Sequence, residues 1–200
     1  MKIGILGGSF DPIHNGHIYM AEAALKEYKL DQVWLMPAGH SPNKNESNMT
    51  SAIDRYNMCC LASSDNDKIT ASDFELKLEN TSYTYRTLSE LKRQYPEHNF
   101  YFIMGADSLD YFKTWKHPEI IASLCTILVV IRDSFSIENM SDTINDISSI
   151  FSCDIRLLKC PKFDVSSTMI RDRIKNSISC NQYMNSKVIE YIENHHLYLP

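Results

Sequence analysis

The chain begins M-K-I-G-I-L-G-G-S-F-D-P-I-H-N-G-H over residues 1–17, and this stretch decides the fold. A short apolar run from Lys2 to Leu6 ends at Gly7-Gly8, which predicts a buried strand. Asn15 to Tyr28 then carries apolar residues on one helical face, which predicts an amphipathic helix. A strand that passes through a glycine turn into a helix predicts the first half of a β-α-β unit.

The same alternation continues along the rest of the chain. It predicts an α/β fold: a doubly wound, mostly parallel sheet of the Rossmann-like kind with right-handed crossovers. We expect one domain over residues 1–200, with 160–200 as a C-terminal helical subdomain. Later strands are expected at 32–36, 68–72, 100–104, 124–131 and 155–158, and helices near 49–60, 88–95, 134–152, 166–175 and 186–194.

Composition narrows the class of protein. Of 200 residues, 44 % are hydrophobic, which allows a large core and argues against global disorder. The net charge of -5 argues against a nucleic-acid partner. The first residues do not resemble a signal peptide, and the longest apolar run, Ile127 to Ile131, is too short to span a bilayer. With six cysteines and no C-x-x-C pair, we expect a cytoplasmic protein with reduced thiols and no membrane partner.

The first candidate anion site follows the first strand. Gly7 and Gly8 let main-chain N–H groups approach an anion, and Asn15 is expected to cap the next helix. His14 and His17 are three residues apart, so both imidazoles can face one ligand. A plain turn with surface histidines and a zinc-binding pair are the alternatives. Neither the G-x-G-x-x-G nor the G-x-x-x-x-G-K-[ST] pattern occurs here.

A second candidate anion site lies near the other end of the chain. Ser166 can cap a helix, which leaves Ser167, Thr168 and first-turn N–H groups for ligand oxygens. Arg171 is expected on the same helical face as Ser167 and Thr168, where its guanidinium can hold two phosphate oxygens. The alternative is an ordinary capped helix with a solvated arginine. Two such sites together indicate a polyphosphate held at both ends.

These motifs resemble those of the nucleotidyltransferase superfamily, which carries H-x-G-H after the first strand and an S-S-T-x-x-R-like motif late in the chain. Here they are His14 to His17 and Ser166 to Arg171. The ordered set is similar to that of the bacterial nicotinate-nucleotide adenylyltransferases over nearly the whole chain. The further matches are Ser82-Tyr83-Thr84, Met104 to Ser108, Thr114-Trp115 and Asn194 to Tyr198.

The resemblance implies adenylyl transfer from ATP to nicotinate mononucleotide, giving nicotinate adenine dinucleotide and pyrophosphate in NAD biosynthesis. It implies that Mg²⁺ is held by the ATP phosphates and water, with no metal ligand from the protein. Catalytic roles are implied for His14, His17, Lys44 and Arg171. ATP contacts are implied for Gly7, Gly8, Ser9, Phe10, Gly105, Asp107, Arg132, Ser167 and Thr168. Acceptor contacts are implied for Tyr83, Thr84, Tyr85, Trp115 and Lys116, with main-chain N–H groups near Tyr85 and Lys116 meeting the carboxylate.

Three positions depart from the family pattern. Asn43 stands where P-P-H-K has its histidine, Thr81 replaces a common proline, and Lys116 replaces a frequent aromatic residue. The nearest alternative is a sister enzyme that uses nicotinamide mononucleotide or phosphopantetheine, although Trp115 and the Ser82-Tyr83-Thr84 turn favour a flat aromatic acceptor. A non-catalytic adenine-nucleotide sensor and a nucleic-acid-binding module are rivals from other classes. Whether the protein forms a homo-oligomer is not readable from the sequence.

Overall fold

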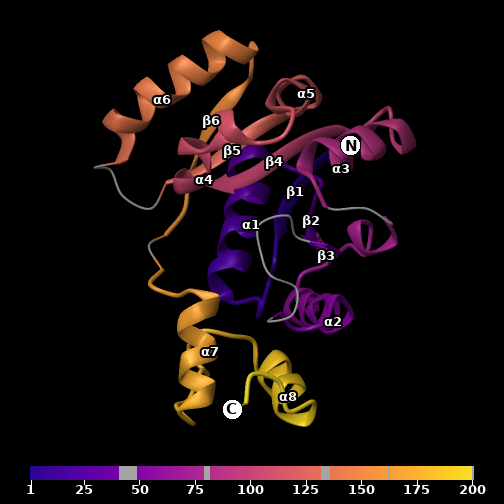
Figure 1. Cartoon of the computed structure of the whole chain (residues 1–200), viewed down its shortest axis with the longest axis vertical. Coiled ribbons are helices and arrows are strands. Elements are labelled where there is room, and N and C mark those ends of the chain that lie inside the picture. The colour runs from indigo at the N-terminus through magenta and orange to yellow at the C-terminus, as the bar shows by residue number, and fades with distance from the viewer. Residues whose placement is uncertain (41–48, 79–81, 132–135, 162, 200) are drawn as a thin grey trace.

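The computed structural model describes residues 1–40, 49–78, 82–131, 136–161 and 163–199 (Figure 1). Its centre is a six-stranded sheet in the order β3-β2-β1-β4-β5-β6. Every neighbouring pair of strands is parallel, which confirms the predicted fold class. The strands are β1 (Lys2–Gly8), β2 (Gln32–Pro37), β3 (Ile69–Ala71), β4 (Asn99–Gly105), β5 (Cys125–Ile131) and β6 (Ile155–Lys159).

Helices cover both faces of the sheet because its side chains alternate between two cores. Leu6 joins a core with α1 and α2, whereas the adjacent Ile5 joins a core with α3 and α5. The α-helices are α1 (Asn15–Tyr28), α2 (Ala52–Ser63), α3 (Thr84–Gln94), α4 (Ala106–Asp110), α5 (Pro118–Leu124), α6 (Ser136–Phe151), α7 (Ser167–Lys175) and α8 (Ser186–Asn194). The 3₁₀ turns are η2 (Glu75–Lys77) and η3 (Phe112–Thr114).

The strand order reverses direction at β1, which lies between β2 and β4. Chain connections on either side of this switch point run to opposite edges of the sheet, so the carboxyl ends of β1 and β4 border an open crevice. β1 ends at Gly8 and β4 at Gly105. Both glycine-containing strand ends of the sequence therefore lie at the place where ligands bind in folds of this type.

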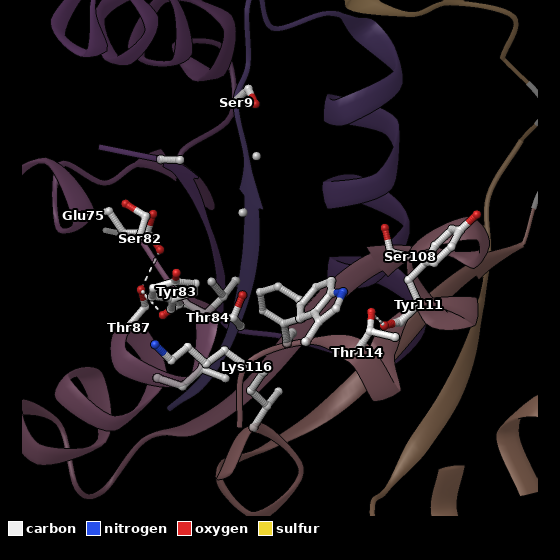
Figure 2. A pocket seen from close by; sticks show the side chains of 18 of the residues that line it. Ser9, Glu75, Ser82, Tyr83, Thr84, Thr87, Ser108, Tyr111, Thr114 and Lys116 are labelled. Carbon is white, nitrogen blue, oxygen red and sulfur yellow. Dashed lines mark hydrogen bonds between the residues drawn. The ribbon is translucent and has the colours of Figure 1, made fainter. Parts of the chain in front are cut away.

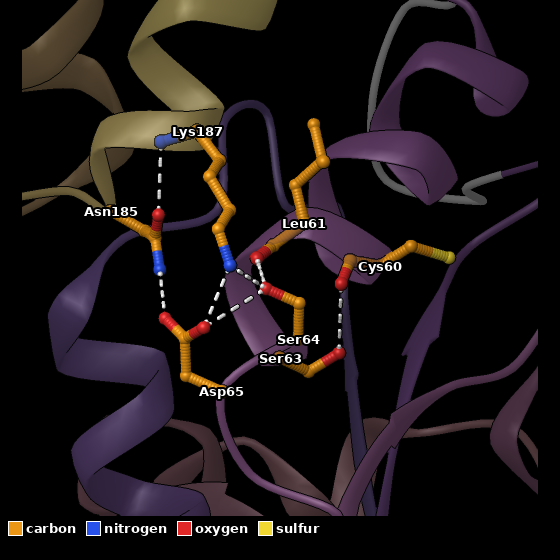
Figure 3. Close-up of polar contacts among 7 residues, drawn as sticks. All are labelled: Cys60, Leu61, Ser63, Ser64, Asp65, Asn185 and Lys187. Carbon is orange, nitrogen blue, oxygen red and sulfur yellow. Dashed lines mark hydrogen bonds and ion pairs between the residues drawn. The ribbon is translucent and has the colours of Figure 1, made fainter.

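The C-terminal helices α7 and α8 lie at the end of the molecule opposite α6 (Figure 1). Val188 and Ile192 of α8 share the core that contains α1 and α2. Polar contacts add to this packing: Lys187 Nζ donates to Asp65 Oδ1 and to Ser64 Oγ, each at 2.7 Å, and Asn185 Nδ2 donates to Asp65 Oδ2 at 3.1 Å (Figure 3). The hydrogen bond from Lys187 is the main reason that the pKa of Asp65 is lowered.

Several local boundaries differ from the sequence-based expectation, and α3 begins at Thr84, four residues before the expected start. Helix α2 begins at Ala52 rather than Met49, because the Ser51 side chain accepts a hydrogen bond from Asp54 N and caps the helix. Strand β5 begins at Cys125, since Leu124 is the last residue of α5. Helices α4 and α5 were not predicted, because each has at most 7 residues and so carries no full apolar stripe.

Candidate active site

The loop from Ser9 to His14 carries the chain from β1 into α1. Phe10 adopts a left-handed backbone with φ 48°, and its ring is only 2 % exposed. His14 is the N-cap of α1, so the expectation that Asn15 caps this helix is wrong. Asn15 is the first helical residue, and its N–H donates to the carbonyl of Tyr183 at 2.8 Å. This long-range bond holds Asn15 within the first turn.

The two histidines face the same side, as their spacing predicts. Their rings stack with centroids 3.7 Å apart, and the edge of His17 meets the Phe10 ring at 4.9 Å. The main-chain N–H of His14 donates to Nδ1 of His17 at 3.2 Å. Because an N–H can donate only to an unprotonated nitrogen, a neutral His17 carries its proton on Nε2. His17 is therefore set to donate through Nε2.

Gly16 is required by close packing rather than by backbone freedom. A Cβ at this position would lie 2.5 Å from Cε2 of Phe163, a buried residue in the segment before α7. The first turn of α1 thus rests directly against the C-terminal part of the chain. This contact explains why glycine stands between the two histidines.

Helix α7 brings the second predicted anion site to the same loop. Ser166 caps it by accepting from Met169 N at 3.2 Å, as expected. Nη1 of Arg171 donates to the carbonyl of Asp11 at 2.7 Å. Nη2 of Arg171 donates to Thr168 Oγ1 at 3.3 Å, which places these two residues on one face. Arg171 and the loop that leads into His14 and His17 are therefore in direct contact.

One detail of this site differs from the expectation. The hydroxyl of Ser167 donates to the carbonyl of Pro12 at 2.9 Å, so it joins α7 to the loop instead of offering its hydrogen to a ligand. The main-chain N–H groups of Ser167 and Thr168 lie in the first turn, where no helical carbonyl is positioned to accept them. These N–H groups, rather than the Ser167 hydroxyl, are suited to an anion.

A cavity of about 890 Å³ runs along the carboxyl ends of the strands (Figure 2). Ser9 lies at one end of the view, and Tyr83 and Lys116 lie toward the other. Of the predicted site residues, the lining contains Gly7, Gly8, Ser9, Tyr83, Thr84, Asp107, Trp115 and Lys116. The cavity therefore reaches from the glycine turn after β1 to the aromatic residues expected at the acceptor. Within the part of the chain that the structure describes, its lining does not include the other predicted phosphate-binding residues, which are Phe10, His14, His17, Ser167, Thr168 and Arg171.

The aromatic end of the cavity is built by the start of α3 and the residues after η3. Nζ of Lys116 lies 4.7 Å from the centroid of the Tyr83 ring. The Trp115 ring packs edge-on against Phe102, with centroids 6.0 Å apart. Tyr83 caps α3, so the N–H groups of Thr84 and Tyr85 lie in the first helical turn and have no acceptor within the helix. This end thus combines flat rings, main-chain donors and one ammonium group.

Tyr85 and Gly105 lie beside the cavity instead of lining it. The Tyr85 ring packs edge-on against His117 at a centroid distance of 4.6 Å, and among the described residues the lining includes Thr84 but not Tyr85. Gly105 is the N-cap of α4, where a Cβ would meet no atom within 4 Å. The cavity lining therefore gives no support to a ligand contact from the Tyr85 side chain.

Outside the loop after β1, sequence reasoning missed two buried charged residues. Glu75 lines the cavity and accepts a hydrogen bond from Thr87 Oγ1 at 2.6 Å, while burial raises the pKa of its carboxyl group. Arg55 is 3 % exposed on α2 and donates to three main-chain carbonyls. Their positions in the sequence carry no recognisable signal, because charged residues on helices and short turns are usually solvated.

Several expectations fall outside the described residues: those for Lys44 and Arg132, and the departures at Asn43 and Thr81. Within the described ranges, no group of three His, Cys, Asp or Glu side chains is placed to hold a metal ion. Among the helices that the structure describes, none is long and apolar enough to cross a membrane.

Comparison with known proteins gives consistent matches. The cytidylyltransferase-like family matches residues 5–173. A probable nicotinate-nucleotide adenylyltransferase of Clostridium botulinum (strain Kyoto / Type A2) is 40 % identical over 97 % of both chains. One from Lachnoclostridium phytofermentans is 36 % identical over 99 % of both. The solved Plasmodium falciparum nicotinic acid mononucleotide adenylyltransferase, complexed with NaAD, has the same fold, with a TM-score of 0.80 and 23 % identity over 98 % of this chain and 97 % of that one.

Proposed function

Since the chain belongs to the cytidylyltransferase-like family and is related over nearly its full length to nicotinate-nucleotide adenylyltransferases, we propose that its crevice transfers the adenylyl group of ATP to nicotinate mononucleotide. The products are nicotinate adenine dinucleotide, used in NAD biosynthesis, and pyrophosphate. One observation carries this assignment. Arg171 and Ser167 of α7 bond to Asp11 and Pro12 in the loop that leads into His14 and His17, which supports one phosphate site built from both ends of the chain.

The reaction needs no nucleophile from the protein. The 5′-phosphate of the mononucleotide attacks the α-phosphorus of ATP in line, the bond to the β-phosphate oxygen breaks, and pyrophosphate leaves. Catalysis is then a matter of positioning and of stabilising charge. His17 donates from Nε2 to an α-phosphoryl oxygen, supported by the stacked His14 ring.

The β- and γ-phosphates of ATP are assigned to hydrogen-bond donors other than the histidines. The main-chain N–H groups of Ser167 and Thr168, with the positive end of α7, suit the β- and γ-phosphates. Arg171 stabilises the pyrophosphate as charge moves onto it, while its Nη1 holds the loop. Lys44 is assigned to the incoming phosphate or the leaving group on family resemblance alone. The Gly7 to Phe10 main chain is assigned to the ATP phosphates on the same ground.

The donor set fits Mg²⁺ that arrives on ATP. Imidazole N–H, guanidinium and helix N–H groups attract the triphosphate and supply no oxygen ligands for a cation. When bound, Mg²⁺ neutralises charge on the transferring phosphates. The placement of adenosine near Gly105, Asp107 and Arg132 is also a proposal, as are the subdomain boundary at residue 160, a cytoplasmic location and any homo-oligomer.

Specificity for a pyridine acceptor is supported by the far end of the cavity. The volume of the whole cavity, about 890 Å³, is within the range of small-molecule sites. Tyr83 and Trp115 offer flat apolar surfaces to an aromatic ring. The first-turn N–H groups of α3 and the Lys116 ammonium suit a carboxylate better than a carboxamide, whose NH₂ would face other donors.

The test is pyrophosphate release by the whole chain with ATP, Mg²⁺ and one of three acceptors. We expect the highest kcat/KM with nicotinate mononucleotide, lower values with nicotinamide mononucleotide, and no turnover with phosphopantetheine. ATP binding without product from any acceptor would identify a sensor and refute the proposal. Preferred use of phosphopantetheine would refute the pyridine assignment.

A further inference from the structure

The loop between β1 and α1 needs external support to keep its shape. Phe10 has φ 48°, a left-handed conformation that is unfavourable for a residue with a Cβ. Such a conformation persists only when the surrounding structure holds it. Gly8 and Ser9, immediately before it, line the proposed substrate cavity. Whatever holds the Ser9–Phe10 peptide group therefore controls one wall of the site.

The guanidinium of Arg55 supplies this support from α2. Nη1 donates to the carbonyl of Ser9 and Nη2 to the carbonyl of Ala38, each at 2.7 Å, while Nε donates to the carbonyl of Thr50 at 3.0 Å. The planar fork of arginine can hold these three acceptors in one rigid arrangement. Arg55 thus joins the loop after β1 to the segments that follow β2 and precede α2.

Burying the positive charge of Arg55 costs free energy, so the presence of an arginine at this position needs an explanation. Arg55 is 3 % exposed, and a buried cation is tolerated only when its donors are satisfied and its charge is balanced. Burial raises the pKa of the Glu75 carboxyl group, and the hydrogen bonds from Thr87 and Ser82 and the positive charge of Arg55 partly offset this rise. An apolar side chain would pack here more easily, so the guanidinium is explained by the carbonyls that it holds.

The C-terminal segment also holds this loop, at Asp11. Tyr198 OH donates to Oδ1 of Asp11 at 2.7 Å, and Asp11 is 4 % exposed. Tyr198 also bonds through its side chain to Thr50, whose carbonyl Arg55 holds. The loop is therefore bonded both to α2, through Arg55, and to the C-terminal segment, through Tyr198.

We infer that Arg55 is a positioning residue for adenylyl transfer, an inference that rests on the proposed function. It acts through the peptide group between Ser9 and Phe10. In a planar trans peptide the C=O and N–H point in opposite directions. When the Ser9 carbonyl is held against Arg55, the Phe10 N–H is fixed in the direction away from it. Loss of the guanidinium frees this group to rotate and misplaces the phosphates that contact the loop.

The test compares Arg55→Lys and Arg55→Met with Tyr191→Phe. Lysine keeps the charge but cannot hold three carbonyls in one plane, and methionine removes every donor. Tyr191→Phe is the matched control, because its hydroxyl bonds to Asp54 and Asn57 on the same helix. Steady-state kinetics with ATP and nicotinate mononucleotide, calorimetric affinity for a non-hydrolysable ATP analogue, and Tm are measured for each.

We expect kcat to fall about 10²-fold in Arg55→Met and about tenfold in Arg55→Lys, since misplacement by about 1 Å costs on the order of 10²-fold. Affinity for the analogue should fall severalfold, while KM for nicotinate mononucleotide stays within about twofold of wild type. Normal kcat and analogue affinity in folded Arg55→Lys would overturn the inference. So would equal losses in Tyr191→Phe at an equal drop in Tm. If the wild-type protein makes no product, the proposed function fails, but analogue affinity still tests Arg55.

Discussion

Replacing His17 by alanine removes the proposed donor to the α-phosphate. The main-chain N–H of His14 donates to Nδ1 of His17, so the proton that remains for the transition state is on Nε2. Loss of one such preorganised donor typically lowers kcat by about 10²–10³, or about 2.7–4 kcal/mol. We expect this loss at saturating ATP and nicotinate mononucleotide.

A second substitution separates this chemistry from the role of His17 in folding. His17 also accepts a capping hydrogen bond and packs against Phe10 at 4.9 Å, so His17→Ala should cost roughly 1–2 kcal/mol of stability. In His17→Gln, the glutamine stands at the third position of α1. Its side-chain oxygen can still accept the hydrogen bond from the main-chain N–H of the N-cap residue His14. We expect nearly normal Tm but strongly reduced kcat.

The assay is coupled pyrophosphate release, run well below the Tm of each variant. Wild-type turnover in folded His17→Ala would refute the assignment of His17 as a donor. A loss in His17→Ala that is fully restored in His17→Gln would show that the imidazole is not required, because the helix cap or the glutamine NH₂ then suffices.

Further substitutions test other parts of the site. Arg171→Ala should raise KM for ATP and lower kcat, because it removes both a phosphate partner and the bond to Asp11; unchanged kinetics would show that α7 does not hold the triphosphate. Gly16→Ala should lower Tm by about 2–8 °C in calorimetry, since overpacking against Phe163 at 2.5 Å outweighs the gain in helix propensity; an unchanged Tm would contradict this packing argument. Lys116→Met should raise KM for nicotinate mononucleotide about threefold to fivefold, because an exposed charge contributes only modestly to binding. KM for nicotinamide mononucleotide should rise less. Equal changes in the two KM values would show that the Lys116 ammonium does not bind the carboxylate.

Much of the fold follows from local sequence patterns. The six strands are short apolar runs because the sheet is covered on both faces, and their parallel order follows from the helices between them. Ser166 was predicted as a cap from residue type alone, since its hydroxyl needs only a partner three residues away. Features that depend on neighbours in the chain are thus readable from sequence.

Features that depend on distant contacts are not readable in this way. Asn15 is a better cap than His14 by residue type, but the carbonyl of Tyr183 holds it inside the first turn. The hydroxyl of Ser167 turns to Pro12, and Arg55 reaches Ser9, across separations of 155 and 46 residues. No local pattern encodes such partners. The role of Arg55 in holding the loop was therefore found only in the folded structure.

The most direct measurement is a crystal structure of the protein with Mg²⁺ and a non-hydrolysable ATP analogue. We predict the α-phosphate within hydrogen-bond distance of His17 Nε2, and the β- and γ-phosphates on Arg171 and the first-turn N–H groups of α7. A triphosphate that touches only one of these two groups would contradict the claim that both ends of the chain hold one nucleotide.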